Sequence, residues 1–175
     1  MNHRSRAAGF LLAGALSGTA LLLTGQPAQA AVPNYFSFTN YGSGKCAGLS
    51  PAEYYDNGAR VIQQTCNGQP EQQWAPVGLG GGNYQWVNAR SGKCMDVKDG
   101  RNADRTPIQQ WDCTNTAGMA WNVPGAIPTP LPVAVVSKIG GRCLDVAAGS
   151  WQDGAAIQTY HCTSGNPAQA WVIHQ

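Results

Sequence analysis

A pattern of cysteine, aspartate, glutamine and aromatic residues occurs twice in this chain at a constant spacing. The stretch "GKCMDVKDGRNADRTPIQQWDC" ends at Cys113, and "GRCLDVAAGSWQDGAAIQTYHC" ends at Cys162. Equivalent positions lie 49 residues apart, and they are Cys94/Cys143, Asp96/Asp145, Ile108/Ile157, Gln109/Gln158, Trp111/Tyr160 and Cys113/Cys162. Such a period indicates a repeat architecture, in which one unit alone is too small to bury its own apolar face.

A weaker copy precedes these two, so the chain holds three copies. They cover residues of about 35–77, 84–123 and 133–173. Each copy closes with a tryptophan, namely Trp74, Trp121 and Trp171. Apolar residues alternate with polar ones inside each copy, as in Leu144 and Val146, and Gly- and Pro-rich segments separate the copies. This pattern predicts short strands bounded by turns.

Each copy has room for about four strands, and in the second copy these are "YQWVNA", "KCMDVK", "PIQQWD" and "MAWNV". Three such units must share one apolar core. A propeller is the alternative architecture, but propellers are usually built from at least four blades. The sequence therefore predicts an all-β fold, a β-trefoil of three four-stranded repeats.

The six cysteines follow the same repeat. Pairing inside each copy is the simplest arrangement that treats the three alike, giving Cys46–Cys66, Cys94–Cys113 and Cys143–Cys162. Disulfides are typical of exported proteins, because the compartments outside the cytosol are oxidising. A zinc site is the alternative, but no two cysteines stand two or three residues apart, as zinc-binding pairs usually do. We expect one disulfide per repeat and no metal.

The first thirty residues have the features of a secretory signal peptide. Arg4 and Arg6 precede an apolar run over residues 7–23, and small residues at Ala28 and Ala30 form a cleavage site. A membrane anchor is the alternative, but Gly and Ser interrupt the apolar run. We predict a signal peptide over 1–30, one domain over 31–175, secretion to the extracellular space and no membrane insertion.

The charge of the mature chain argues against polyanionic partners. Of the eleven basic residues, Arg4 and Arg6 lie in the signal peptide, which leaves nine basic residues against nine acidic ones. Nucleic-acid binding depends on basic side chains that displace counterions from phosphates. We therefore expect no nucleic-acid partner, and we expect a monomer without a cofactor.

The strand pattern places the repeated polar residues on one face. If Leu144 and Val146 point into the core, Asp145 points away from it, and the neighbouring strand does the same with Gln158 and Tyr160. A carboxylate and an amide can bind neighbouring hydroxyls, and an aromatic ring can cover the C–H face of a sugar. The alternative is that the aspartates cap turns and the rings cover the surface. Repetition of all three residues beside a disulfide favours sugar binding.

The motifs "CMDV…IQQWDC" and "CLDV…IQTYHC…QAW" resemble those of ricin B-chain-type lectins and of the related family 13 carbohydrate-binding modules. The resemblance covers essentially the whole mature chain. It implies a β-trefoil with a Gln-x-Trp repeat, whose three lobes can each hold a sugar in a shallow pocket. It also implies that the Asp and the Gln bind sugar hydroxyls while the aromatic residue stacks on the ring. These roles fall on Asp145, Gln158 and Tyr160, and on Asp96, Gln109 and Trp111.

The first lobe departs from the family pattern. Gly48 stands at the position of the Asp, Thr65 stands near Cys66 in place of the aromatic residue, and Gln63 is interpreted as the surviving amide. We therefore expect this lobe to be a scaffold without a sugar site.

The other lobes depart in their last loop. Met119 replaces the Gln of the Gln-x-Trp signature in the second lobe, and a polar residue that often precedes this Gln in the family is Gly118 there and Ala168 in the third lobe. We expect weak sites, or sites that recruit other polar residues of these loops, namely Asn166, Asn115 or Thr116. Trp151 is either a second stacking surface for sugar or packed against its own loop.

The sequence gives little support to catalysis. Glycoside hydrolysis needs two carboxyl groups about 5 to 10 Å apart, but Asp96 and Asp145 belong to different lobes. A protease inhibitor or protein-binding scaffold is the main alternative, with "VPGAIPTPLPV" as its protruding loop. We predict a secreted, non-enzymatic lectin-like protein without catalytic residues. It would bind galactose-type sugars or a plant polysaccharide such as xylan.

Overall fold

The computed structural model describes residues 33–175, and the predicted signal peptide lies outside them. The first repeat contains β1 (Ser37–Asn40), β2 (Cys46–Leu49), β3 (Val61–Gln64) and β4 (Trp74–Gly80). The second contains β5 (Asn83–Asn88), β6 (Cys94–Val97), β7 (Thr106–Trp111) and β8 (Trp121–Asn122). The third contains β9 (Val133–Ala134), β10 (Val136–Ser137), β11 (Cys143–Val146), β12 (Ile157–Tyr160) and β13 (Ala170–His174).

The predicted all-β fold of four-stranded repeats is confirmed, with one difference in the third repeat. Its first strand is divided into β9 and β10, because β9 pairs with β13 while β10 pairs with β8 and β11. The helical segments of the described residues are single 3₁₀ turns. These are η1 (Pro51–Glu53), η2 (Pro70–Gln72), η3 (Lys98–Gly100), η4 (Ala117–Met119), η5 (Ala147–Gly149) and η6 (Pro167–Gln169).

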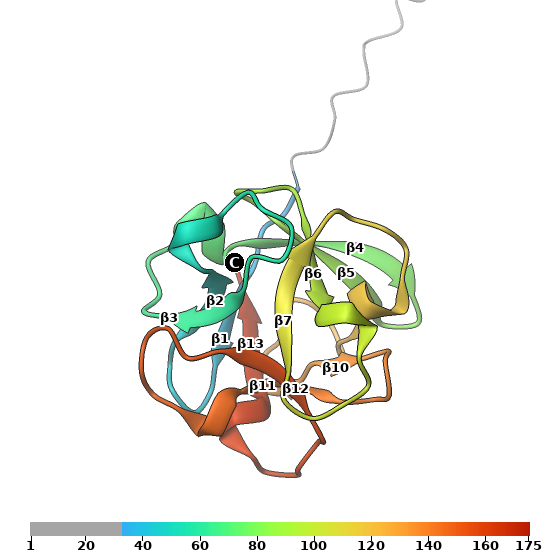
Figure 1. Ribbon diagram of the computed structural model, residues 1–175. Helices are drawn as coiled ribbons and strands as arrows, with labels where there is room; N and C mark the ends of the chain where they lie inside the picture. The colour runs from blue at the N-terminus through green and yellow to red at the C-terminus, as the bar shows by residue number, and fades with distance from the viewer. Residues whose placement is uncertain (1–32) are drawn as a thin grey trace, which may run out of the picture. The chain divides into compact units, whose positions relative to one another are not determined.

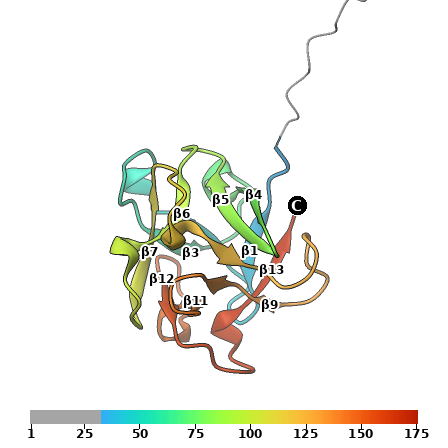
Figure 2. The ribbon, with the colours of Figure 1, turned by 90° about the vertical axis from the view of Figure 1, so that its right-hand side faces the viewer.

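The strands form two sheets, one built from the first and third repeats and the other from all three. One has the order β3-β2-β1-β13-β9, and the other has the order β4-β5-β6-β7-β12-β11-β10-β8. In each repeat the second and third strands form an antiparallel hairpin, and the hairpins β2–β3, β6–β7 and β11–β12 lie around the middle of the molecule in Figure 1. The first and last strands pair with each other from Ser37 opposite His174 to Asn40 opposite Trp171, as Figure 2 also shows.

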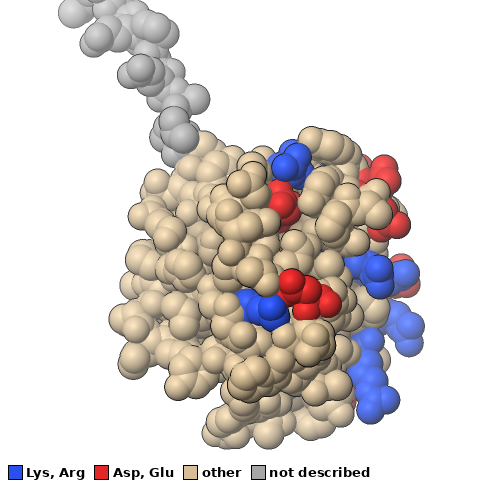
Figure 3. All heavy atoms as spheres, turned by 90° about the vertical axis from the view of Figure 1, so that its left-hand side faces the viewer, with Lys and Arg blue, Asp and Glu red and all other residues tan. Residues whose placement is uncertain are grey.

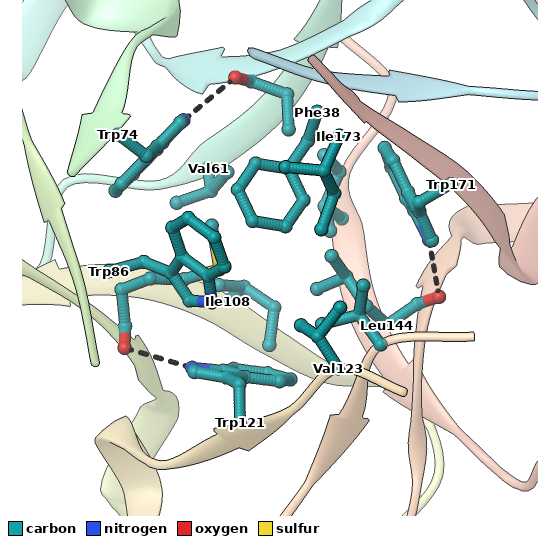
Figure 4. Packing of buried hydrophobic residues seen from close by; sticks show 14 of the residues in the cluster. Phe38, Val61, Trp74, Trp86, Ile108, Trp121, Val123, Leu144, Trp171 and Ile173 are labelled. Atoms are coloured by element: carbon teal, nitrogen blue, oxygen red, sulfur yellow. Dashed lines mark hydrogen bonds between the residues drawn. The ribbon is translucent and has the colours of Figure 1, made fainter. Parts of the chain in front are cut away.

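The three closing tryptophans occupy equivalent positions in one shared core. Each is fully buried, and each indole N–H donates to a backbone carbonyl of the second strand of its own repeat (Figure 4). The Nε1–O distances are 3.1 Å from Trp74 to Ala47, 3.2 Å from Trp121 to Met95 and 2.8 Å from Trp171 to Leu144. A buried indole N–H usually finds a partner, and this bond ties the last strand of each repeat to the second.

The predicted disulfides are confirmed, one in each repeat. Cys46 pairs with Cys66 at a sequence separation of 20, and Cys94–Cys113 and Cys143–Cys162 each span 19 residues. Each bridge joins the start of the second strand to the segment that follows the third strand. A closed loop of this size stabilises a fold by about 3 kcal/mol in the chain-entropy model. The bridge therefore holds together the two strands that carry the predicted site residues.

Within residues 33–175, none of the helical segments has the length and apolar character needed to cross a lipid bilayer.

Candidate functional site

The hairpin of the third repeat brings the predicted acid, amide and ring together. In the β11–β12 register Asp145 is directly opposite Gln158, and Cys143 is opposite Tyr160. Alternate residues of a strand lie on the same face, so the three side chains share one face of this hairpin. The β6–β7 hairpin repeats the arrangement, with Asp96 opposite Gln109.

Two amides hold the carboxylate of Asp145. Gln158 donates from Nε2 to Oδ1 at 2.8 Å, and Gln169 donates from Nε2 to Oδ2 at 3.1 Å. Gln169 also donates to the carbonyl of His161 at 2.9 Å and accepts from the amide of Thr163 at 2.8 Å. Gln169 is the Gln of the Gln-x-Trp signature, so this signature both ties the loop to the end of β12 and positions the carboxylate.

Asp145 is more deeply buried than a residue on an open strand face. Only 5% of it is exposed, because η6 packs over β11 and supplies Gln169. Burial raises the pKa of the Asp145 carboxyl above its ordinary value, and the hydrogen bonds from Gln158 and Gln169 oppose this rise by stabilising the charged form. The site is therefore a recessed carboxylate fixed in orientation, rather than a freely exposed one.

A pocket of about 570 Å³ opens above this carboxylate. Asp145, Gln158 and Tyr160 line it together with the turn Ala147–Gly149 and with Asn166. A volume of this size is within the usual range for small-molecule sites. The pocket thus contains the predicted residues of the third lobe except Trp151.

Asn166 has a divided role at the edge of this pocket. Its Oδ1 accepts from the backbone amide of Ala168 at 3.0 Å and so caps η6. Its Nδ2 makes no hydrogen bond with the described residues, so it can donate to a ligand. The sequence predicts that Asn166 replaces the polar residue that the family often has at the position of Ala168. The free Nδ2 of Asn166 at the edge of the pocket is compatible with this prediction.

The second lobe has a smaller version of the pocket. Its volume is about 240 Å³, and Asp96, Gln109, Trp111, Thr116 and Met119 line it. Asn115, the other residue considered for this loop, is not among the lining residues.

The carboxylate of Asp96 receives one side-chain amide instead of two. Gln109 donates to its Oδ2 at 2.9 Å, whereas the sulfur of Met119 faces the backbone amide of Thr114 at 3.3 Å. Burial raises the pKa of Asp96 above its ordinary value, and the bond from Gln109 opposes this rise. A Cβ atom at Gly118 would lie 2.7 Å from the Asp96 carboxylate, so the absence of a side chain at Gly118 makes room for this acid.

In the first lobe, the sequence interpretation of Gln63 is wrong. Gly48 is opposite Ile62 and Cys46 is opposite Gln64, so Ile62 occupies the amide position and Gln64 the ring position. Gln63 points elsewhere and donates to the carbonyls of Ser150 and Gln152 at 2.7 and 2.8 Å. In the other lobes the amide lies four residues before the second cysteine, and the residue four before Cys66 is Ile62. The letters Ile-Gln-Gln at 62–64 therefore match those at 108–110 only with a shift of one residue. This lobe lacks the acid, the amide and the ring.

Trp151 lies in a neighbouring hollow instead of the Asp145 pocket. This hollow has a volume of about 360 Å³, and its lining includes Tyr41 of the first lobe. Trp151 is 69% exposed and Tyr41 is 65% exposed. The hollow shares Gly149, Asn166 and Ala168 with the Asp145 pocket, so the two adjoin each other.

Comparisons with known proteins agree with this architecture. A family model described as "Ricin-type beta-trefoil lectin domain-like" matches residues 9–111, and one described as "Ricin-type beta-trefoil lectin domain" matches residues 82–175. A search of curated protein sequences found no match.

Several solved structures are similar. The designed threefold-symmetric protein ThreeFoil is 29% identical with a TM-score of 0.75, covering 81% of this chain and 98% of its own. An exo-β-1,3-galactanase from Clostridium thermocellum is 29% identical with a TM-score of 0.73, covering 80% of this chain but 30% of its own. A ricin B-like lectin from Macrolepiota procera, solved in complex with lactose, is 20% identical with a TM-score of 0.68, covering 84% of this chain and 99% of its own. The family models and the trefoil of three disulfide-linked repeats show that this chain belongs to the ricin-type β-trefoil lectins, a family of carbohydrate-binding domains.

Proposed function

We propose that this protein is secreted and binds carbohydrate without catalysis, with the third-lobe pocket as its main site. The observation that carries the proposal is the Asp145 carboxylate, which two amides hold at the base of an open pocket beside Tyr160. A buried carboxylate destabilises a fold unless its partners compensate. Its presence here, with Gly48 at the equivalent position of the first lobe, fits a role in binding rather than in folding.

The polar groups of the pocket match the edge of a sugar ring. Each oxygen of Asp145 has accepted one amide N–H and retains lone pairs for a sugar hydroxyl. The Oε1 of Gln158 is not engaged by other described residues and can accept a second hydroxyl, while Nδ2 of Asn166 can donate. Tyr160 supplies an aromatic face for the C–H groups of the sugar, and Ala147–Gly149 line the pocket with it.

For the ligand we propose galactose-type sugars first and a plant polysaccharide such as xylan second. Two of the similar structures support the first class by what they are named for, an exo-β-1,3-galactanase and a lectin in complex with lactose. The molecular surface supports binding that does not depend on net charge. On the face in Figure 3, acidic and basic side chains lie close to one another, and most of the surface is uncharged.

The second-lobe pocket is proposed as a weaker site of the same kind. It offers Asp96, Gln109 and Trp111, and Trp111 is 42% exposed and available for stacking. Its carboxylate lacks the second amide, so more of its orientation must be fixed when the ligand binds. Ordering of side chains on binding reduces affinity.

Trp151 is proposed to stack on a further sugar of a longer chain. The hollow that it lines with Tyr41 adjoins the Asp145 pocket, and both rings present most of their surface to solvent. Replacing Trp151 with Ala should weaken binding of a tetrasaccharide while leaving that of a monosaccharide unchanged. An equal loss for both ligands would contradict this role.

The test of the proposed function compares Asp145→Asn with wild type on a glycan array and in pull-downs with insoluble galactan and xylan. Asparagine keeps the shape of the side chain but removes the charge, so the fold should remain and third-lobe binding should fall at least tenfold. Asp112→Asn is the matched control, because Asp112 is exposed and lies outside both pockets. Unchanged binding by Asp145→Asn would refute the proposal.

One observation favours glycoside hydrolysis as a second candidate. Asp99 lines the second-lobe pocket with Asp96, and its negative charge contributes to the raised pKa of Asp96. Two carboxyl groups at one sugar are what hydrolysis requires. Release of reducing sugar that disappears in Asp99→Asn would support hydrolysis, and intact oligosaccharide after prolonged incubation would exclude it for that ligand.

A further inference from the structure

Equivalent loop positions just before the third strand of each repeat have the same backbone conformation. They are Gly58, Arg105 and Gly154, with φ values of 90°, 63° and 84°. Each donates its backbone N–H to the following repeat, from Gly58 to Gln110, from Arg105 to Thr159 and from Gly154 to Gln63, at distances of 2.9, 2.8 and 2.9 Å. The left-handed conformation is therefore part of the junction between lobes.

Arginine is the unusual residue of the three. Glycine adopts positive φ without steric conflict, whereas a residue with a Cβ atom is strained there. The first and third repeats follow this rule and the second does not. Strained residues persist where the surrounding structure holds them, and they are enriched at functional sites.

This loop position lies beside the pocket of the next lobe, so Arg105 borders the third-lobe pocket. A Cβ atom at Gly58 would lie 3.9 Å from both Gln109 and Trp111, so this loop position of the first lobe borders the pocket of the second. By the same relation Arg105 of the second lobe borders the third-lobe pocket, and it lines that pocket with Asp145 and Tyr160. The third-lobe pocket thus includes a side chain from a neighbouring lobe.

The guanidinium of Arg105 is also available. Among residues 33–175 it takes part in no ion pair, and the adjacent carboxylate of Asp104 is engaged by His161 and Arg142. Asp145, the carboxylate of the same pocket, accepts from two amides and forms no ion pair with Arg105 in the described part of the chain. Arg105 is exposed and is the one cationic residue among the described residues that line this pocket.

We propose that Arg105 makes the third-lobe pocket selective for glycans that carry an anionic group, a uronic acid carboxylate or a sulfate ester, next to the sugar held by Asp145. A guanidinium binds both groups through paired N–H donors. The inference rests on the proposed sugar site and adds its ligand class. Because Arg105 is exposed, its contribution is modest and decreases with ionic strength.

The test uses calorimetric titration with three matched pairs of ligands: lactose with and without a sulfate ester, a xylo-oligosaccharide with and without a glucuronic acid side group, and galactose with galacturonic acid. Wild type should bind the anionic member about three- to tenfold more tightly at low salt, and added salt should reduce this preference. The sulfate and uronic acid arms show which anion the site accepts.

Arg105→Gly is the decisive variant, because it installs the residue of the other two repeats. It should bind neutral and anionic members equally, keep the neutral affinity of wild type, and unfold at the same temperature or about 2 °C higher. Arg105→Lys should retain part of the preference. A wild type that binds both members equally, or an Arg105→Gly that keeps the preference, overturns the inference while the sugar site stands. Absence of binding to every ligand overturns the proposed function, and the inference with it.

Discussion

At the scale of single residues, the charge of Asp145 is the property on which the proposed sugar binding depends. An ionised carboxylate accepts hydrogen bonds through both oxygens, whereas the protonated form has one donor and a reduced acceptor capacity. Gln158 and Gln169 point N–H donors at this group, so protonation would also leave one of these donors without a good acceptor. The site is built for the charged form even though burial disfavours it.

Binding by the third lobe should therefore weaken in acid, and it should do so at a higher pH than an ordinary carboxyl would allow. Burial raises the pKa of Asp145, with a smaller rise from Asp104 and a smaller fall from His161, so protonation begins at a higher pH than for an ordinary carboxyl of about 3.9. Affinity for a neutral sugar, measured between pH 7 and pH 4, should fall as the pH drops through this raised pKa. Far-ultraviolet circular dichroism at each pH would confirm that the fold persists. Constant affinity down to pH 4 would contradict the prediction.

Residues on the repeated strands could be predicted, and those supplied by loops could not. The pairing of Asp145 with Gln158 follows from strand alternation and from the disulfide that fixes the hairpin. The bond from Gln169 and the position of Arg105 depend on how η6 and a neighbouring lobe fold over the hairpin. The sequence carries a signal for Arg105, because glycine stands at the equivalent positions of the other two repeats.

At the scale of elements, the loop that ends in η4 distinguishes the second lobe from the third. Gln169 makes three hydrogen bonds, to Asp145, to the carbonyl of His161 and from the amide of Thr163. In the first lobe Gln72 similarly accepts from Asn67 and donates to the carbonyl of Thr65. In the second lobe Met119 stands at the position of Gln72 and Gln169, and its sulfur is only a weak acceptor for the backbone amide of Thr114.

Met119→Gln should repair the second lobe. The side chains are similar in length, and the new amide can accept from Thr114 and donate to Asp96 as Gln169 does to Asp145. We expect the variant to be more stable by about 0.5–1.5 kcal/mol, the usual net value of a hydrogen bond, and to bind sugar more tightly at the second lobe. Urea unfolding and titration in an Asp145→Asn background would measure both. The reciprocal change Gln169→Met should weaken the third lobe, and a neutral result in both directions would refute this account.

Elements were predicted where the pattern was periodic, and an error arose where similar residues lie one position out of register. The four strands of the second repeat appear as expected, because alternation and turn residues both mark them. In the first repeat Ile62-Gln63-Gln64 has the same letters as residues 108–110 of the second repeat but lies one residue closer to the second cysteine, so Gln63 was given the wrong register. A shift of one residue in a strand moves a side chain to the opposite face, and the distance to the second cysteine is the more reliable guide here.

At the scale of the whole molecule, clusters of charged and polar side chains join the lobes at three equivalent places, through ion pairs at two of them and through a hydrogen bond from Asn57 to Asp112 at the third. Each place combines the residue before the first cysteine of a lobe, the residue before its second cysteine and a loop residue of another lobe. The three sets are Lys45, Thr65 and Asp153; Lys93, Asp112 and Asn57; and Arg142, His161 and Asp104. The acid of each set has a lowered pKa, mainly through its bond with Lys45, Lys93 or His161 respectively.

These pairs should make the trefoil less stable in acid. A carboxyl whose pKa is lower in the folded state stabilises the fold above its unfolded pKa of about 3.9, and this contribution is lost as the pH falls through the folded pKa. Asp96 and Asp145 have the opposite effect on the pH dependence of stability. Burial raises the pKa of each, so protonation in acid removes a buried charge and favours the folded state. Wild type should lose stability in urea unfolding between pH 4 and pH 2.

The matched variant for this prediction replaces Asp104, Asp112 and Asp153 with Asn. It should be less stable than wild type at pH 7, and its stability should change less between pH 4 and pH 2. An unchanged pH dependence would show that these exposed pairs do not contribute to the acid response. Each pair is exposed and screened by salt, so the difference should shrink at high ionic strength.

The two pockets on one rigid trefoil also predict stronger binding to polymers than to single sugars. A single shallow site has an affinity of about 1 mM, but after one site binds, the second meets its ligand at a high effective concentration. Asp96→Asn and Asp145→Asn should each reduce retention on insoluble galactan or xylan by more than tenfold, while affinity of the remaining site for monosaccharide stays the same. The double variant should show no retention. If Asp96→Asn is retained as strongly as wild type, the second lobe takes no part in binding, and the protein acts through its third lobe alone.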